Sequence, residues 1–348
     1  MLLRATTPLP ADRQSMNPEP AAPPPVIEHR LDRSSKLKLP RETGILGALV
    51  LMLLVLTIFI PQFRAIGNLT NITRNFSFVG IVALGMTLVV LTGGIDLSVG
   101  STWGVSAVVT ASLLTGGWPL IAAVLAGPIV AAAVGLLNGF CITRLRMSPF
   151  VPTLASLSIA RSLALIITRG RPISIYGQRQ EAFLWIGGGD ILGIPNPFII
   201  FVIMAVVFWI SLSRTVWGRH VYAVGGNERT ARLTGLNVDR LKVVVYVLSA
   251  VCAGIAGVIQ VSYLSSATAD LGTGEELAVI AATVIGGTNL AGGEGTIFGT
   301  VIGAMILEVL RNGLLLFGVD PYWQGVFVGA VIILAVSMDY FRNLLRNE

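Results

Sequence analysis

The chain has 348 residues, of which 54% are hydrophobic and only 12% are charged, and its formal net charge is +6. Soluble domains carry about a quarter charged residues, so this composition excludes an ordinary soluble protein and indicates a polytopic membrane protein. The basic excess is then explained by the orientation of loops at a membrane, without any nucleic-acid partner.

The first 43 residues differ from the rest of the chain. They contain proline-rich runs such as "PEPAAPPP", a basic segment "RLDRSSKLKLPR", and almost no apolar periodicity. We predict that 1–43 is a disordered cytoplasmic tail. Because about forty mostly polar residues precede the first apolar run, that run is expected to be a retained helix and not a signal peptide.

Apolar runs of membrane-spanning length follow, at about 17–22 residues per crossing. They predict an all-α fold of about ten transmembrane helices, within a membrane domain over 44–340 and before a short cytoplasmic tail over 341–348. The expected spans are 44–60, 76–92, 97–115, 119–139, 149–168, 197–213, 243–264, 270–288, 296–317 and 321–338.

The connections between these spans set the orientation. Most lysines and arginines outside the spans fall in 1–43, 140–148, 211–242 and 339–348, so the positive-inside rule places both termini and the loop 214–242 in the cytoplasm. Glycine-rich flanks leave open whether the segments near 97–115 and 270–317 cross fully or re-enter.

One carboxylate stands alone in the first half of the chain. Between Asn75 and Thr143, Asp96 is the only acidic or basic residue, and it lies in "GGIDLSVG", after Gly93 and Gly94. Glycine interrupts a helix, and unwound backbone in a bilayer survives only inside protein or beside a watery cavity. Asp96 is therefore predicted to lie at a helix break, where it either faces a translocation path or caps the following helix.

A second glycine-rich stretch, "GGTNLAGG", repeats this pattern with Gly286, Gly287 and Asn289. The pairs "LLNG" and "LRNG", which contain Asn138 and Asn312, follow the two motifs. These echoes predict an internal repeat with broken helices in both halves, a usual sign of a translocation path. The candidate path residues are Asp96, Asn138, Asn289 and Asn312.

The embedded asparagines have a second interpretation, since Asn138 and Asn312 could instead join helices by hydrogen bonds. Glu308 and Arg311 lie three residues apart and are expected to pair with each other, which favours a structural ion pair over a proton relay. Arg161 lies within a span and has no obvious partner. Cys141 and Cys252 indicate no disulfide, and no metal site is predicted.

The basic loop contains a segment with signals for the start and the end of a helix, "VGGNERTARLTGLNV". Asn227 is a good N-cap, Glu228 is an acid in the first turn, and Gly235 is a C-terminal stop, so 227–235 should form a short helix. Arg229 and Arg232 would share one side of it. Such a helix would be marginal alone in water, so we predict that a partner binds it.

Four stretches resemble the permease subunits of ribose-type sugar ABC importers: "LTGGIDLSVGS", "GRHVYAVGGNERTARLTGLNV", "ATVIGGTNLAGGEGTIFGTVIGA" and "RNGLLLFGV". The resemblance covers about 44–340. It implies a bacterial inner-membrane subunit that dimerises, binds a cytoplasmic ABC ATPase through the loop helix, and receives sugar from a periplasmic binding protein. The general permease signature is met loosely, since Arg229 and Thr230 replace its two alanines and Gly235 follows Glu228 by seven residues instead of six.

The sequence contains no G-x-x-x-x-G-K-[ST] phosphate-binding loop. ATP and Mg²⁺ are therefore expected to bind a partner ATPase, and no cofactor is expected in this chain. A proton-coupled carrier or a channel is the alternative, although it leaves the loop helix unexplained. A membrane enzyme is disfavoured, because the only histidines are His29 and His220, in the tail and the basic loop.

Overall fold

The computed structural model describes residues 42–176, 180–331, 333–334 and 337. The predicted tails 1–43 and 341–348 lie outside the described residues, apart from residues 42 and 43, which begin the first helix. The predicted span 321–338 is helical over 324–331.

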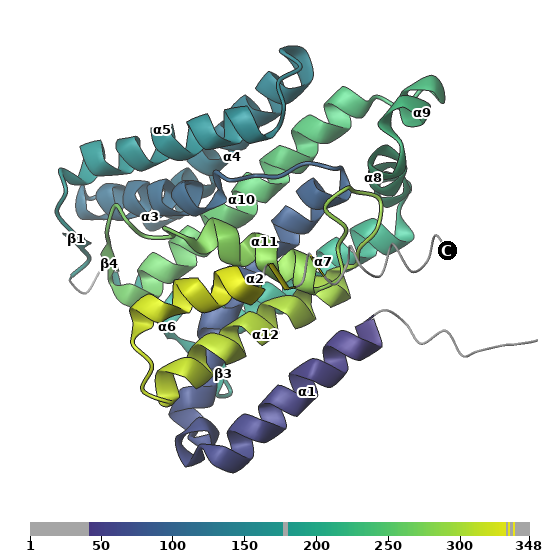
Figure 1. The fold of residues 1–348 in the computed structure, drawn as a ribbon. Coiled ribbons are helices and arrows are strands. Elements are labelled where there is room, and N and C mark those ends of the chain that lie inside the picture. The colour runs from purple at the N-terminus through teal and green to yellow at the C-terminus, as the bar shows by residue number, and fades with distance from the viewer. Residues whose placement is uncertain (1–41, 177–179, 332, 335–336, 338–348) are drawn as a thin grey trace, which may run out of the picture. The chain divides into compact units, whose positions relative to one another are not determined.

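The described part consists of helices packed against one another, with four very short strands (Figure 1). The helices are α1 (Glu42–Phe59), α2 (Ile66–Leu91), α3 (Val99–Thr115), α4 (Leu120–Arg144), α5 (Phe150–Thr168), α6 (Glu181–Gly188), α7 (Asn196–Arg214), α8 (Val216–Gly226), α9 (Glu228–Leu233), α10 (Val238–Leu264), α11 (Glu275–Ile285) and α12 (Ile297–Leu316). The 3₁₀ turns are η1 (Pro61–Arg64) and η3 (Pro321–Trp323), and the strands are β1 (Ile173–Ser174), β2 (Asp190–Ile191), β3 (Ile194–Pro195) and β4 (Ser266–Ala267).

Six of the described helices are long and apolar enough to cross a membrane, namely α2, α4, α5, α7, α10 and α12. Helices α1 and α3 are apolar but shorter. The total of about ten crossings therefore stays a prediction.

The expected crossing over 270–288 is much shorter than predicted. Helix α11 has 11 residues, which at 1.5 Å per residue span about 16 Å, roughly half of a bilayer's hydrocarbon core. Gly272 and Gly274 precede the helix with positive φ, and Gly287 follows it with φ 86°. Glycines at both ends thus stop α11 before it can cross, in agreement with the re-entrant alternative.

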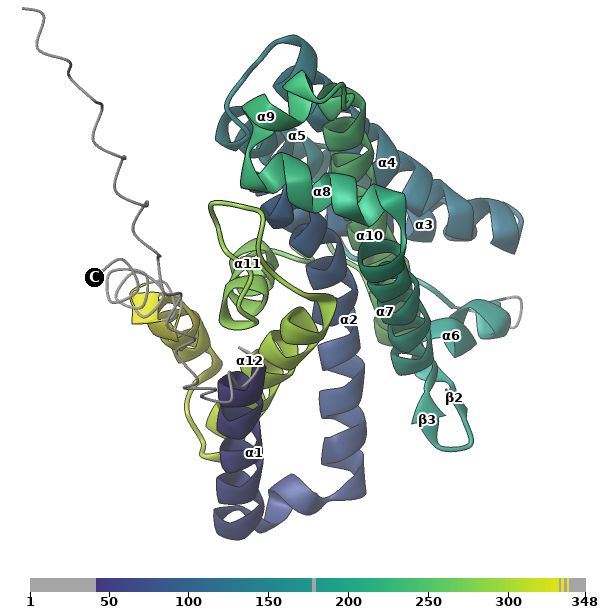
Figure 2. The same cartoon turned by 90° about the vertical axis from the view of Figure 1, so that its right-hand side faces the viewer.

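Helices α2 and α10 form the centre of the described part. In its most apolar window α2 is 89% buried and α10 is 61% buried, whereas α4, α5 and α7 are 22–28% buried. Helix α10 packs against α2, α3 and α4, and α2 lies between α12 and α7 (Figure 2). The apolar surfaces of α2 and α10 are therefore buried against other helices, whereas those of α4, α5 and α7 remain exposed and are expected to face lipid.

The segment that leads into α11 is held from two sides. Strand β1 pairs antiparallel with β4, with Ile173 opposite Ala267. Arg161 of α5 donates hydrogen bonds to the carbonyls of Ala269 and Leu271. The sequence showed no partner for Arg161, because its partners are backbone oxygens about a hundred residues away.

Candidate functional site

Asp96 is fully buried where the chain passes from α2 to α3. Its Oδ1 accepts hydrogen bonds from the backbone N and the Oγ of Ser98, at 3.0 and 2.6 Å, and its Oδ2 accepts one from Ser249 of α10 at 3.3 Å. This is an Asx turn, in which a carboxylate orients the backbone two residues ahead. Asp96 was expected either to face a path or to accept the free N–H groups of the next helix. It instead accepts the N–H of Ser98, the residue that directly precedes α3.

Asn138 extends the same set of contacts. Its Nδ2 donates to Ser98 Oγ at 2.9 Å, and its Oδ1 accepts from Ser156 Oγ of α5 at 2.6 Å. Asn138 is fully buried. These five residues, Asp96, Ser98, Asn138, Ser156 and Ser249, form a buried polar chain that joins the α2–α3 connection to α4, α5 and α10, as the helix-packing interpretation of Asn138 predicts.

The second glycine-rich motif forms a similar turn. Asn289 Oδ1 accepts from the backbone N of Ala291 at 2.9 Å, at the position that aligns with the Asp96 turn. Positive φ falls on Gly93 in the first motif and on Gly287, Gly292 and Gly293 in the second, and none of these three aligns with Gly93. The side-chain turn is thus shared but the backbone paths differ, and an internal duplication remains a prediction.

The two glycine-rich loops meet each other at the end of α8. The N–H of Gly293 donates to the carbonyl of Leu91 at 2.9 Å. A Cβ atom on Gly225 would lie 1.7 Å from that same carbonyl oxygen, and one on Gly292 would lie 2.9 Å from the amide nitrogen of Gly93. Backbones approach this closely only where a side chain is absent. We call Gly93, Gly225 and Gly292 the glycine junction.

A polar cavity of about 270 Å³ lies among α2, α3, α10, α11 and α12. We call it the central cavity, and its lining residues are Asn75, Phe78, Val79, Trp103, Gln260, Glu275, Glu308, Arg311, Asn312, Leu315 and Gln324. Of the four predicted path residues, Asn312 alone lines it. Polar and charged side chains from different helices therefore converge on one space, although the sequence separates them by up to 249 positions.

Asn312 also joins two helices. It exchanges hydrogen bonds with Asn68 of α2, at 3.1 Å and 2.8 Å. The packing and the cavity-lining interpretations of Asn312 are therefore both consistent with its position.

The expected pairing of Glu308 with Arg311 is wrong. Arg311 Nη1 lies 3.1 Å from a carboxylate oxygen of Glu275, in the first turn of α11. Spacing of three residues permits an ion pair on one helix, but a carboxylate on the adjacent helix is closer here. Glu308 is 7% exposed, lines the central cavity, and forms no ion pair among the described residues.

The predicted loop helix is confirmed as α9, which is six residues long. The Asn227 side chain accepts from the N–H of Thr230 at 2.9 Å and so caps its start. At its end, the N–H groups of Gly235 and Leu236 donate to the carbonyls of Arg232 and Ala231. This pattern, with Gly235 at φ 86°, is a Schellman C-cap.

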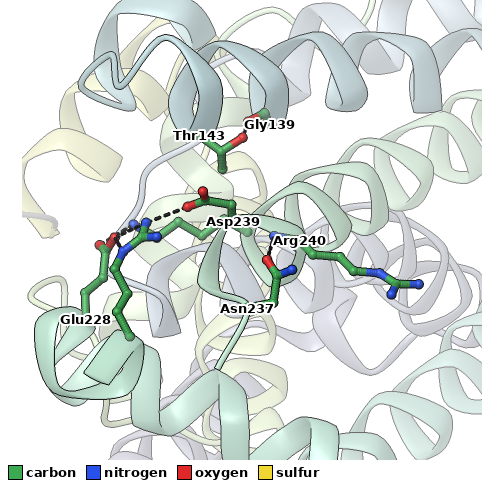
Figure 3. Close-up of polar contacts among 8 residues, drawn as sticks. Gly139, Thr143, Glu228, Asn237, Asp239 and Arg240 are labelled. Carbon is green, nitrogen blue, oxygen red and sulfur yellow. Dashed lines mark hydrogen bonds and ion pairs between the residues drawn. The ribbon is translucent and has the colours of Figure 1, made fainter. Parts of the chain in front are cut away.

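Four charged side chains tie α9 to the start of α10 (Figure 3). Glu228 binds Arg232 at 2.9 Å and Lys242 at 2.6 Å, and Arg232 also binds Asp239 at 2.5 Å. Burial by itself would raise the pKa of Glu228, but the hydrogen bonds from Lys242 and Arg232 outweigh it and lower that pKa. We call Glu228, Arg232, Asp239 and Lys242 the loop network, and it borders a second cavity, of about 490 Å³.

The outer side of α9 carries a feature that the sequence did not single out. Leu233 is 82% exposed, and Arg229, four residues earlier, is also exposed. Arg232, which was expected beside Arg229, is instead held within the loop network. An apolar side chain at a polar loop tip was the available signal for Leu233, but its exposure depends on how α9 is rotated.

Comparisons with known proteins agree that the similar proteins are transport permeases. The family described as the permease component of the branched-chain amino acid transport system matches residues 68–336. The ribose import permease protein of Escherichia coli K12 is 42% identical over 88% of this chain and 95% of its own length. The L-arabinose ABC transporter permease protein of Azospirillum brasilense is 34% identical over 96% and 98%, and the D-allose transport system permease protein of E. coli K12 is 36% identical over 84% and 90%.

Proposed function

The chain belongs to the branched-chain amino acid transport system / permease component family, and we propose that it is the membrane permease subunit of an ATP-driven importer for a monosaccharide or a similar small polar solute. The relatives named above are permeases for ribose, L-arabinose and D-allose. Such a subunit forms the path through the membrane and is not itself an enzyme.

The observation that carries the proposal is the position of α9. One residue, Asn227, separates this capped helix from α8, and α8 ends at the glycine junction. A partner that moves α9 would therefore displace α8 and, through it, the loops that follow α2 and α11. A loop required only for membrane orientation would need neither the two caps nor this contact.

The proposal assigns partners to the chain. A cytoplasmic ABC ATPase would bind α9, through Arg229 and Leu233, and would hold ATP and Mg²⁺. A periplasmic binding protein would deliver the sugar, and a second permease subunit would complete the path in the inner membrane. Both termini would then lie in the cytoplasm, as the distribution of basic residues favours.

One observation favours a second candidate, a proton-coupled carrier. Glu308 is a nearly buried carboxyl group at the central cavity, and it forms no ion pair among the described residues. Carboxyl groups in such positions serve proton relays in other membrane transporters.

Reconstitution with the ATPase distinguishes the two candidates. The chain, the ATPase and the binding protein are assembled in proteoliposomes, and uptake of labelled D-ribose, L-arabinose and D-allose is measured with ATP and with a non-hydrolysable analogue. We expect uptake only with hydrolysable ATP, and we expect it to persist when an ionophore collapses the proton gradient. Uptake that needs the gradient and proceeds without ATP hydrolysis would favour the carrier.

A further inference from the structure

We propose that the central cavity is itself a binding site for a small uncharged polyhydroxylated solute, held within a single permease subunit. This inference rests on the proposed function and adds a site to it. The transported solute would therefore pause on this chain after leaving its binding protein.

The first argument is that three buried polar atoms at the cavity lack partners. Among the described residues, Trp103 Nε1, Gln260 Oε1 and Arg311 Nε have no hydrogen-bond partner, and all three residues line the cavity. Trp103 is 1% exposed. Each buried polar atom left unpaired costs about 1–3 kcal/mol, so an occupant of the cavity that reached these atoms would be stabilised by pairing with them.

The second argument concerns the chemistry of that occupant. Trp103 and Arg311 offer donors and Gln260 offers an acceptor, and a hydroxyl group can satisfy either kind because it both donates and accepts. Glu275 is paired with Arg311, and Glu308 adds a carboxylate that forms no ion pair among the described residues, so the cavity disfavours an anion. A neutral solute with several hydroxyl groups satisfies the polar atoms without that repulsion.

The third argument concerns size and walls. The volume, about 270 Å³, is close to the lower end of the range for small-molecule sites, about 300–1,000 Å³. Leu315, which is half exposed beside the nearly buried Phe78 and Val79, supplies apolar surface that can pack against C–H groups of a sugar ring. The cavity therefore suits one sugar unit better than an extended oligosaccharide.

The fourth argument concerns position. Gln260 lies 22 residues after Val238, the first residue of α10, which corresponds to about 33 Å along the helix. Helix α9 lies at the opposite, N-terminal end of α10, as Figure 2 shows. Solute in the cavity would thus be separated from the ATPase-facing loop by the length of a membrane span.

The test is protection of an introduced cysteine in the purified complex of this chain with its ATPase, without the binding protein. Leu315→Cys places a thiol at the cavity, and Leu192→Cys places a control thiol on the β2–β3 turn, where the residue is 97% exposed. Both variants carry Cys141→Ser, because Cys141 is partly exposed whereas Cys252 is buried. A maleimide reports the labelling rate with and without D-ribose, L-arabinose or D-allose at high millimolar concentration.

We expect at least one neutral sugar to slow the labelling of Leu315→Cys at least threefold and to leave Leu192→Cys unchanged. Ribose 5-phosphate, which is an anion, should give no protection. Adding Gln260→Leu, which keeps the side chain similar in size, should abolish the protection. Gln62→Leu, a change at an exposed glutamine of η1, should preserve it.

The inference is overturned if none of the three sugars protects Leu315→Cys, if ribose 5-phosphate protects equally, or if protection survives Gln260→Leu. Its failure is separable from that of the proposed function. ATP-dependent uptake without protection would remove only the binding site, whereas protection without ATP-dependent uptake would keep the site and remove the importer.

Discussion

Replacing Gly225 by alanine tests whether the glycine junction links the loop helix to the membrane helices. The new Cβ atom would lie 1.7 Å from the carbonyl oxygen of Leu91. That oxygen belongs to backbone and already accepts the N–H of Gly293 at 2.9 Å, so no side chain can rotate away. The end of α8 must retreat by about 1.3 Å to restore even the shortest contacts that Cβ atoms make.

Overpacking of this kind costs about 1–3 kcal/mol, and the gain from replacing a helical glycine by alanine offsets up to about 1 kcal/mol. The net loss is therefore up to about 3 kcal/mol, and at about 2–4 °C per kcal/mol for large domains we expect the melting temperature to fall by up to about 12 °C. Because α8 moves relative to Leu91, ATP hydrolysis should also become less dependent on the binding protein and its sugar.

Gly226→Ala is the matched control, since the neighbouring residue has no atom within 4 Å of an added Cβ. Melting of the purified complex and sugar-stimulated ATPase activity would be measured on both variants at equal abundance. Gly226→Ala should match the wild type or exceed its stability slightly. If Gly225→Ala matched it too, in both stability and coupling, the backbone contact at Leu91 would have no mechanical role.

Two further predictions follow from the site. Asp96→Asn should retain more uptake than Asp96→Leu, because an amide can still accept from Ser98 and meet Ser249 whereas leucine removes all three hydrogen bonds; equal uptake by Asp96→Leu and the wild type would contradict this. Leu233→Ser should weaken ATPase binding by about tenfold or more, since burying a leucine contributes about 1.5–3 kcal/mol, whereas Leu192→Ser should not; co-purification of the ATPase with each variant measures the difference.

Local signals predicted the loop helix well. Asn227 and Gly235 act on the backbone within a few residues, so their types and spacing fix the start and the end of α9 whatever surrounds it. The hydrogen bonds from Ser98 to Asp96 likewise reach only two residues along the chain. Where a prediction depended on backbone caps and turns of this kind, the structure agrees with it.

Contacts between residues far apart in the chain could not be predicted from the sequence. Arg311 binds Glu275, 36 residues away, and not Glu308 on its own helix, because the choice depends on how α11 packs against α12. The cavity is a similar case, since Gln260 and Trp103 look like isolated residues in apolar runs until their helices are brought together. Periodicity also could not tell the short α11 from a full crossing, since both are apolar runs flanked by glycine.

Helices α2 and α12 connect the loops of the glycine junction to the central cavity, and this arrangement bears on how the two are coupled. Helix α2 ends at the junction with Leu91 and carries Asn75 of the cavity 16 residues earlier, about 24 Å away. Helix α12 begins after the loop that holds Gly292 and carries Glu308, Arg311 and Asn312 beyond its midpoint. A shift of α8 would therefore reach the cavity as movement of two packed helices, and no relay of side chains between the sites is required. Because the two helices are also fastened to each other near the cavity, through Asn68 and Asn312, we expect them to move together there.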